Sequence, residues 1–370
     1  MKNSELILRN SPLYPLRFEP IYKNYLWGGH RFRELFRRSI PVADNTNCNP
    51  ENDIIAESWE ISDHVHGESV VRNGQLNGFT LHEILLSHPL ELLGADNVNP
   101  NALPQRFPLL LKYLDAAQSL SVQVHPDDIS ARRLLLSDAG KTEAWVVVDA
   151  GKDSFIWVGT RQSYTAQEQE QLIRSHNWDE LLNRVQVREG DCFFIPPGTL
   201  HALGAGVLVA EVQTSSDMTF RLFDWDRLDR DGKPRELKVE EGIQVLQNPA
   251  EPIVAQQPLK TEDIHCERLV VDENFTINRW TLEEPYAWYN DQRCHLWTVL
   301  SGTLVISFTA GRRTNRFGNS ERATDPDAIE VLQQGDSILI PAVCRHFHCI
   351  PENGCRVVFL DIFTDHFAKE

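Results

Sequence analysis

Four polar side chains of this chain combine residue types and spacings that suit metal binding. Gln123 and His125 are two residues apart in an alternating segment, so in a β-strand they point to the same face. Glu143 belongs to a second alternating segment, and His201 follows a tight turn. Two imidazoles and one carboxylate form the donor set of several catalytic zinc sites, whereas the amide oxygen of Gln123 would be an unusual ligand. Such an incomplete shell leaves room for water or a substrate.

Each of these residues also has an ordinary structural explanation. His125 precedes Pro126 and could hydrogen-bond a turn, Glu143 could pair with Lys141 or an arginine, and His201 could be an ordinary histidine after a turn. If strands bring these side chains to one barrel mouth, a charged Glu143 without a cation would cost on the order of several kcal/mol. Taken together, the residues favour a metal site.

The segment 190–201 determines the position of His201. Residues 192–195 are apolar and predict a short strand, and the two prolines that follow cannot donate to a sheet ladder. Gly198 then allows the backbone to reverse tightly, so that His201 begins the next strand. The segment is repeated at 335–346, where Val343 replaces the turn glycine.

The repeat predicts a second β-barrel of the same ancestry. Residues 295–302 also resemble the strand that starts at Glu143, but the second copy has no counterpart of Gln123 and His125. We therefore expect the second barrel to be structural.

Further patterns predict a mainly β protein with a few inserted helices. Apolar or alternating runs at 57–62, 108–114 and 208–213 are typical of strands. Thr80 with Glu83, and Thr165 with Glu168, match the capping box, and apolar residues recur at helical spacing after each. These signals predict helices over about 80–93 and 165–184.

Length and composition predict a soluble protein of two domains. The chain has 370 residues, and residues 41–53 and 248–258 have the composition of an exposed loop and a linker. We expect a catalytic domain over 1–250 and a degenerate domain over 251–370. A net charge of −17 argues against nucleic acid or an anionic membrane as a partner. Seven cysteines without close pairing, no signal peptide and no long apolar run favour the cytoplasm.

The turn at 190–201 resembles the second motif of the cupin β-barrels, whose histidine binds a metal. Longer segments resemble type I mannose-6-phosphate isomerases of the short bacterial form, from about Pro20 to the C-terminus. They are Leu-Ser-Val-Gln-Val-His-Pro-Asp-Asp, Gly-Lys-Thr-Glu, Pro-Pro-Gly-Thr-Leu-His-Ala-Leu-Gly and Asp-Met-Thr-Phe-Arg-Leu-Phe-Asp-Trp-Asp-Arg. Ala144, where many short members have cysteine, and Val343 depart from the pattern.

This resemblance implies two cupin (jelly-roll-like) β-barrels and an enzyme that interconverts mannose 6-phosphate and fructose 6-phosphate. One Zn²⁺ per chain would be held by Gln123, His125, Glu143 and His201, and Arg221 would be the active-site arginine. The expected partner is a small sugar phosphate, and the expected assembly is a monomer or weak homodimer.

Isomerisation through an enediolate needs a base and a partner for negative charge. Lys141 could be the base or could bind phosphate, and Ser121 could donate to phosphate or to the backbone. Arg221 offers a planar fork for either anion. Two other functions fit the same residues: a metal-dependent cupin dioxygenase, which usually needs a histidine in place of Gln123, and a non-catalytic regulator that binds sugar phosphate.

Overall fold

The computed structural model of the protein describes residues 2–40, 54–99, 103–229, 231–247, 252–308, 312–314, 320–322 and 329–364. The chain divides into two compact units, and each is made of two facing antiparallel sheets. We call Pro20–Glu68 with Pro108–Gln257 the first barrel, and Met1–Glu19 with Ser69–Phe107 and Pro258–Glu370 the second barrel. The predicted fold class, mainly β with two cupin barrels and a few helices, is confirmed.

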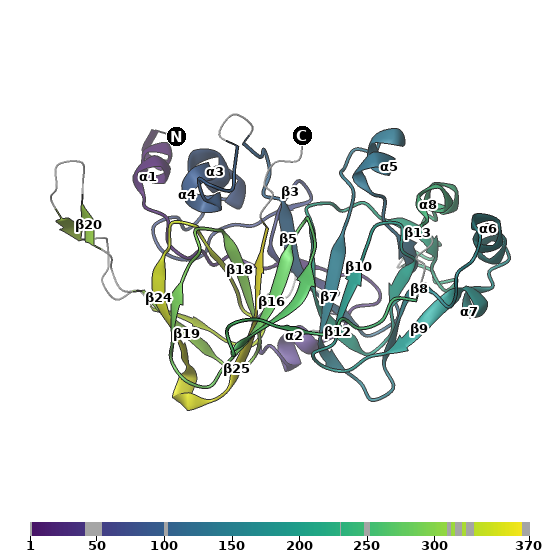
Figure 1. Cartoon of the computed structure of the whole chain (residues 1–370). Helices are drawn as coiled ribbons and strands as arrows, with labels where there is room; N and C mark the ends of the chain where they lie inside the picture. The colour runs from purple at the N-terminus through teal and green to yellow at the C-terminus, as the bar shows by residue number, and fades with distance from the viewer. Residues whose placement is uncertain are drawn as a thin grey trace. The chain divides into compact units, whose positions relative to one another are not determined.

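The first barrel pairs a six-stranded sheet with a five-stranded one (Figure 1). The larger sheet has the order β1 (Ile21–Lys23), β2 (Glu57–Ile61), β5 (Leu109–Ala116), β12 (Val207–Thr214), β7 (Glu143–Ala150) and β10 (Cys192–Ile195). The smaller sheet has the order β13 (Phe220–Phe223), β6 (Val122–Val124), β11 (His201–Leu203), β8 (Phe155–Thr160) and β9 (Leu182–Gln186). A two-stranded ribbon, β3 (Asp63–His64) with β4 (Gly67–Glu68), and the short helices α2 (Arg31–Glu34), α5 (Asp128–Arg133) and α8 (Val239–Val245) complete it.

The second barrel repeats the six-strand order of the larger sheet, but its smaller sheet has four strands in the described residues instead of five. Its larger sheet has the order β14 (Leu259–Lys260), β15 (Cys266–Val271), β16 (Thr276–Leu282), β25 (Val357–Phe363), β18 (His295–Ser301) and β23 (Ser337–Ile340). The smaller has the order β17 (Tyr286–Tyr289), β24 (His346–Pro351), β19 (Leu304–Ser307) and β22 (Ile329–Leu332). The remaining elements are α1 (Lys2–Asn10), α3 (Leu81–Ser87), α4 (Pro89–Leu93), the pair β20 (Arg312–Thr314) and β21 (Ser320–Arg322), and the 3₁₀ turn η2 (Glu352–Gly354).

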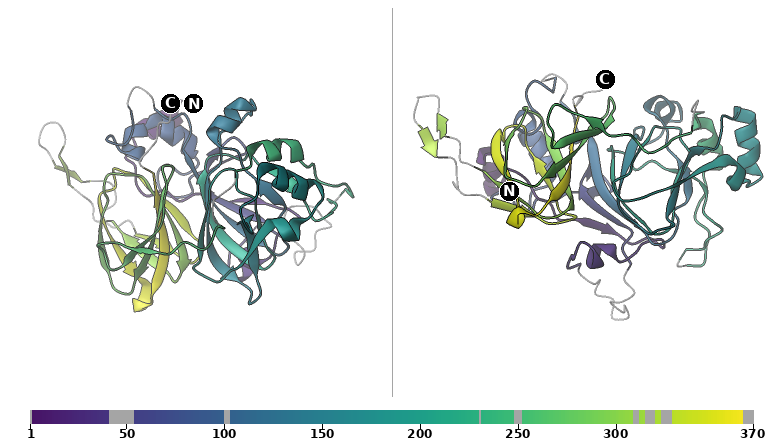
Figure 2. Two further views of the ribbon diagram at one scale, coloured as in Figure 1. Left: turned by 45° about the vertical axis from the view of Figure 1, so that its right-hand side comes forward. Right: turned by 60° about the horizontal axis from the view of Figure 1, so that its bottom comes forward.

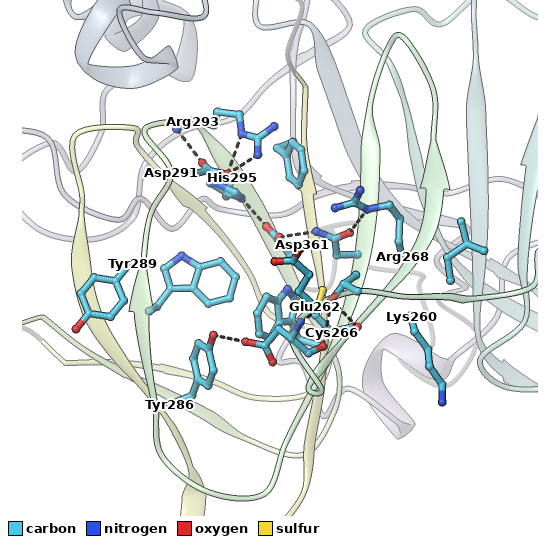
Figure 3. Close-up of a pocket in the computed structure, with 17 residues that line it drawn as sticks. Lys260, Glu262, Cys266, Arg268, Tyr286, Tyr289, Asp291, Arg293, His295 and Asp361 are labelled. Carbon is cyan, nitrogen blue, oxygen red and sulfur yellow. Dashed lines mark hydrogen bonds and ion pairs between the residues drawn. The ribbon is translucent and has the colours of Figure 1, made fainter.

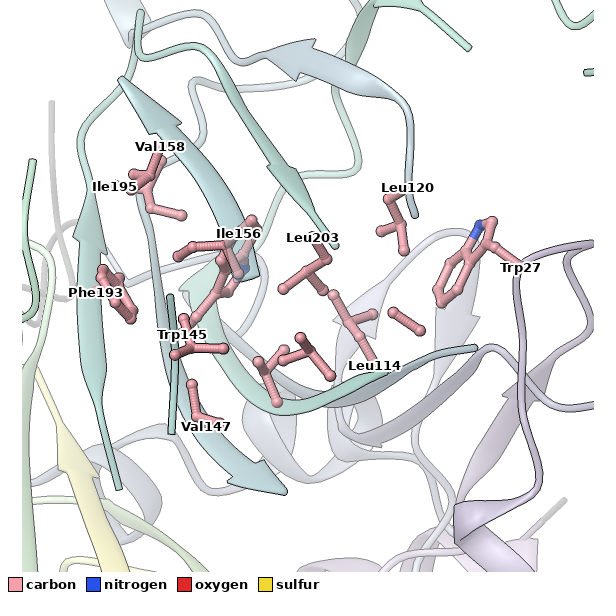
Figure 4. Close-up of a cluster of buried hydrophobic side chains, with 14 of the residues drawn as sticks. Trp27, Leu114, Leu120, Trp145, Val147, Ile156, Val158, Phe193, Ile195 and Leu203 are labelled. Carbon is pink, nitrogen blue, oxygen red and sulfur yellow. The ribbon is translucent and has the colours of Figure 1, made fainter. Parts of the chain in front are cut away.

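Alternation along the strands builds the core between the two sheets of the first barrel. Trp145, Val147 and Leu203 point inward and pack with Phe193 and Ile156 (Figure 4). Burying each such side chain contributes roughly 1.5–3 kcal/mol. The opposite faces of β6 and β11 are also apolar, because the helices α6 (Ala166–Arg174) and α7 (Trp178–Leu181) cover them (Figure 2).

Both predicted helices are shorter than expected. The helix over 80–93 is two helices, α3 and α4, because Pro89 has no N–H to continue the first and instead begins the second. The helical insertion over 165–184 ends at Leu181, and Leu182 already belongs to β9. Both capping boxes are present, at Thr80 and Thr165.

The division of the chain differs from the predicted boundary at residue 250. Residues 1–19 and 69–107, with the helices α1, α3 and α4, belong to the same unit as the C-terminal barrel. The catalytic and degenerate roles of the two parts remain predictions. The predicted loop at 41–53 lies outside the described residues, as does the start of the predicted linker. Within the described ranges no helix is long and apolar enough to cross a membrane, and six cysteines are free thiols.

Replacing Thr165 by alanine should lower the free energy of unfolding by about 1 kcal/mol. The Thr165 hydroxyl accepts a hydrogen bond from the backbone N–H of Glu168, and alanine leaves that helix-end donor unpaired. Urea unfolding followed by circular dichroism measures this loss. Serine in place of Thr165 is the control, because it keeps the hydroxyl and should lose little.

Candidate metal centre

A cluster of three buried side chains lies between the sheets of the first barrel. Nε2 of His125 is 3.3 Å from Oε2 of Glu143, and Nε2 of His201 is 3.3 Å from Oε1 of the same carboxylate. One potential ligand atom from each residue lies within 4.8 Å of the others. Three of the four predicted metal ligands therefore meet at one point.

The turn before β11 places His201 beside the end of β6. Gly198 has a φ of +79°, and its N–H donates to the carbonyl of His125 at 2.8 Å. A Cβ at this glycine would lie 2.5 Å from Cγ of Gln247, so a larger residue would displace the turn as well as strain it. Glycine is thus required for the approach of the two histidines.

Both imidazoles are held in one tautomer by the backbone. Nδ1 of His125 lies 2.8 Å from the carbonyl of Met218, and Nδ1 of His201 lies 2.9 Å from that of Thr199. A carbonyl can only accept, so each Nδ1 carries the proton and each Nε2 presents a lone pair. Burial lowers the pKa of His125 to about 3 and also lowers that of His201, which keeps both rings neutral.

The carboxylate between the rings is ionised. Burial alone would raise the pKa of Glu143, but the charge of Lys141, whose Nζ lies 2.8 Å away, holds it well below its usual value. Oε1 of Glu143 and both Nε2 atoms are buried without a hydrogen-bond partner in the described part of the chain, and Oε2 of Glu143 is paired with Lys141. The lone pairs of the two Nε2 atoms and of the Glu143 oxygens face one another and repel, so these atoms fit a bound cation. Two imidazoles with one carboxylate suit Zn²⁺.

Gln123 and Arg221 lie next to this cluster on adjacent strands. Gln123 is the direct register partner of His201 on one side and of Arg221 on the other. Directly paired residues of antiparallel strands share a face, so these three side chains leave the sheet on the same side. Gln123 as a fourth ligand and Arg221 as the substrate arginine remain predictions.

Arg221 is half-buried, and no carboxylate among the described residues forms an ion pair with it. Its Nη1 donates to the backbone carbonyl of Glu236 at 2.9 Å, and Nε is buried without a partner among the described residues. The nearby carboxylate of Asp224 is bound instead by Arg227 and Arg235. Burial lowers the pKa of Arg221, which leaves a desolvated cation close to the cluster.

Lys141 is buried and links Glu143 to a second carboxylate that sequence reasoning missed. Its Nζ is 3.5 Å from Oε1 of Glu211, and the other carboxylate oxygen, Oε2, accepts a hydrogen bond from the Trp145 indole at 3.0 Å. Burial and the charge of Glu143 raise the pKa of Glu211. Ser121 is buried as well, two residues before Gln123.

The chain of buried charges continues away from the cluster. Nζ of Lys112 is 3.2 Å from Glu211 and 3.6 Å from Glu57, whose carboxylate also accepts from the Trp59 indole at 2.7 Å. Burial would lower the pKa of Lys112, but the two carboxylates raise it. The sequence did contain a signal for this chain of charges, because Glu57, Lys112 and Glu211 each lie in a predicted strand of apolar or alternating residues.

The second barrel has a related arrangement in which a histidine takes the position of the carboxylate and faces aspartates. His295 starts β18 as Glu143 starts β7, opposite Ile340 and Ile195 respectively. Nδ1 of His295 is 2.6 Å from Asp361, and Nε2 is 3.0 Å from Asp291. The Trp297 indole donates to Asp361 at 3.0 Å, as Trp145 donates to Glu211.

The histidine of this second arrangement is an imidazolium. Burial alone would lower the pKa of His295, but Asp361 and Asp291 outweigh it and raise the pKa to about 9. The potential metal groups found among the described residues all lie in the first barrel, at His125, Glu143 and His201 and at His64, His66 and Asp217.

We expect this imidazolium to make the second barrel sensitive to alkaline pH. A histidine whose pKa rises from 6.5 to about 9 on folding contributes its full stabilisation below pH 6.5. That contribution, on the order of a few kcal/mol, is lost as the pH rises through about 9. Urea unfolding between pH 6 and 10 measures the loss, which should disappear in His295→Gln. A pH profile that His295→Gln leaves unchanged would contradict the assignment.

Comparisons with known proteins agree with the geometry. Residues 16–144 match the family model "Phosphomannose isomerase type I, catalytic domain". The mannose-6-phosphate isomerase ManA of Bacillus subtilis is 40% identical over 291 residues, which span 78% of this chain and 86% of that protein. The chain belongs to the type I mannose-6-phosphate isomerase family. The predicted family and enzyme class are thereby confirmed.

Other isomerases of the family cover nearly the whole chain. The mannose-6-phosphate isomerase of Streptococcus mutans is 36% identical over 329 residues, 88% of this chain and 92% of that protein. The crystal structure of the mannose 6-phosphate isomerase from Bacillus subtilis has a TM-score of 0.78 and 29% identity, covering 95% of this chain and 99% of that one. The similarity to isomerases of this family therefore includes both barrels.

Proposed function

We propose that this chain interconverts mannose 6-phosphate and fructose 6-phosphate with one zinc ion held by Gln123, His125, Glu143 and His201. The observation that carries the proposal is the convergence of two buried imidazole lone pairs on an ionised, buried carboxylate. The names of the relatives supply mannose 6-phosphate as the substrate, and fructose 6-phosphate is the ketose that aldose-ketose isomerisation of this sugar forms. A bound zinc ion would act as a Lewis acid on the oxygens of the open-chain sugar.

The proton moves between C2 and C1 through an enediolate, and Lys141 is the group we propose to move it. Its Nζ is buried 2.8 Å from Glu143, a proposed zinc ligand, so a sugar whose oxygens bind the zinc would bring C1 and C2 close to Lys141. Glu211, with its raised pKa, is a neighbour 3.5 Å away that can exchange a proton with the amine. Arg221 stabilises the developing negative oxygen, and Ser121 donates to the phosphate.

The proposal also covers the localisation, oligomeric state and partners of the enzyme. We propose a cytoplasmic enzyme, monomeric or weakly dimeric, whose partner is a sugar phosphate and not nucleic acid or a membrane. The free thiols in the described ranges and the net charge of −17 support this setting.

A coupled assay tests the function directly. Purified holoenzyme is given mannose 6-phosphate, and fructose 6-phosphate is measured as it forms, with metal content measured on the same sample. Turnover that is lost with a chelator and restored by zinc supports the proposal. Oxygen consumption with bound iron would support the dioxygenase alternative, and sugar phosphate binding without turnover would support the regulator.

A further inference from the structure

The second barrel contains a cavity that the isomerase reaction does not use. Its volume is about 830 Å³, within the range of small-molecule sites, and all of its lining residues lie between Leu259 and Phe363 (Figure 3). His295 and Asp361 line it, at the strand positions where the first barrel has Glu143 and Glu211. The cavity is thus the counterpart of the metal-binding mouth.

Side chains at the polar base of this cavity neutralise one another. The His295 imidazolium lies between Asp361 and Asp291, and Arg293 forms a second ion pair with Asp291. The other oxygen of Asp361 accepts from the amide of Asn278 at 3.3 Å. A metal ion would have to displace a cation that is already bound, so the site suits an organic ligand.

Aromatic rings form one side of the cavity. Trp280 and Trp288 are more than nine-tenths buried, with ring centroids 4.6 Å apart, and Tyr286 packs against both. The two indole N–H groups have no hydrogen-bond acceptor in the described part of the chain. Aromatic faces with neighbouring polar groups suit a ring that is apolar on its face and hydroxylated at its edge.

A half-buried arginine lies on the other side. Figure 3 shows Arg268 opposite Tyr286 and Tyr289. Arg268 donates through Nε to Asn278 at 3.3 Å, and its two Nη groups have no carboxylate partner among the described residues. Lys260 pairs in register with Glu267, so its side chain leaves the sheet on the face opposite to that of Arg268. A guanidinium fork with both Nη groups available is suited to a phosphate group.

We propose that the second barrel is a metal-independent binding site for a hexose phosphate, with the sugar ring on the aromatic side and the phosphate on Arg268. This site is separate from the zinc cluster and does not depend on the proposed isomerase activity. It would let the enzyme sense sugar phosphate at a place where no reaction occurs.

Fluorine NMR of the full-length holoenzyme, labelled with 5-fluorotryptophan, tests the proposal at the cavity itself. Trp280→Phe and Trp288→Phe assign the two resonances. The probe is 1,5-anhydromannitol 6-phosphate, a closed-ring sugar phosphate without an aldehyde, which cannot be isomerised. We expect both resonances to shift saturably, and Arg268→Ala to raise the apparent Kd by about tenfold or more, the effect of one charge-assisted contact.

Arg279 offers the matched control, because it lies on the neighbouring strand, pairs with Glu267 at 2.6 Å and does not line the cavity. Arg279→Ala should leave the Kd unchanged. Separate titrations with 1,5-anhydromannitol and with inorganic phosphate should each need at least tenfold more ligand. Equal affinity for the unphosphorylated sugar, equal affinity for phosphate alone, or no shift with any probe would each overturn the proposal, whatever the isomerase assay shows.

Discussion

Replacing His201 by alanine is expected to remove both the bound metal and the activity. His201 is fully buried and aims Nε2 at Glu143, so its loss opens a gap that no described side chain fills. Lewis-acid stabilisation is worth several kcal/mol, so turnover should fall by a factor on the order of 1,000 or more. Elemental analysis of the purified variant and the coupled assay measure the two effects.

His346 provides the control for this experiment. It is the sequence counterpart of His201 in the second barrel, but it is exposed and has no carboxylate partner among the described residues. His346→Ala should therefore keep one zinc per chain and full turnover. Two equivalents of metal in the unmodified protein, or metal that survives His201→Ala, would show that the first-barrel cluster is not the single site.

Arg221→Ala should retain fold and metal while turnover falls by about 100-fold or more, the scale of one lost electrostatic partner of a transition state. The side chain already lies half-desolvated beside Gln123, with a buried Nε that lacks a partner in the described chain. Arg221→Lys should restore little, because an ammonium cannot reproduce the planar fork. Steady-state kinetics with mannose 6-phosphate, together with the zinc content, measure this.

Arg184 is a suitable comparison for Arg221. It belongs to the same sheet but lies on the edge strand β9, where its guanidinium stacks 3.5 Å from the ring centre of Phe155. Arg184→Ala should cost packing and leave kcat and KM close to those of the unmodified enzyme. Arg221 would be removed from the mechanism by an alanine variant with near-normal kcat and KM.

Local patterns were enough to predict that His125, Glu143 and His201 lie together. Alternation in β6 put Gln123 and His125 on one face, and the proline-glycine turn fixed the position of His201. The prediction failed to include Glu211, Lys112 and Glu57, because these residues meet only through the strand order β2, β5, β12, β7. Strand order depends on long-range pairing, which spacing along the chain does not reveal.

The repeat of the turn was read correctly as a second barrel, but the histidine after the turn faces a different way in the two copies. In β24 His346 is exposed and Phe347 points into the core, whereas in β11 the histidine itself points inward. A shift of one residue exchanges the two faces of a strand. The turn of the first barrel uses Gly198 at a positive φ, and Val343 has no such backbone angle.

The exchange between the two barrels changes which side chains balance the charge at the mouth of each barrel. In one barrel a carboxylate on the strand faces imidazoles, and in the other an imidazole, His295, faces carboxylates. Because protonated His295 pairs with Asp361 and Asp291, the mouth of the second barrel is neutralised by its own side chains. We infer that the ligand of this mouth can change by mutation without an ion being needed to hold the barrel together.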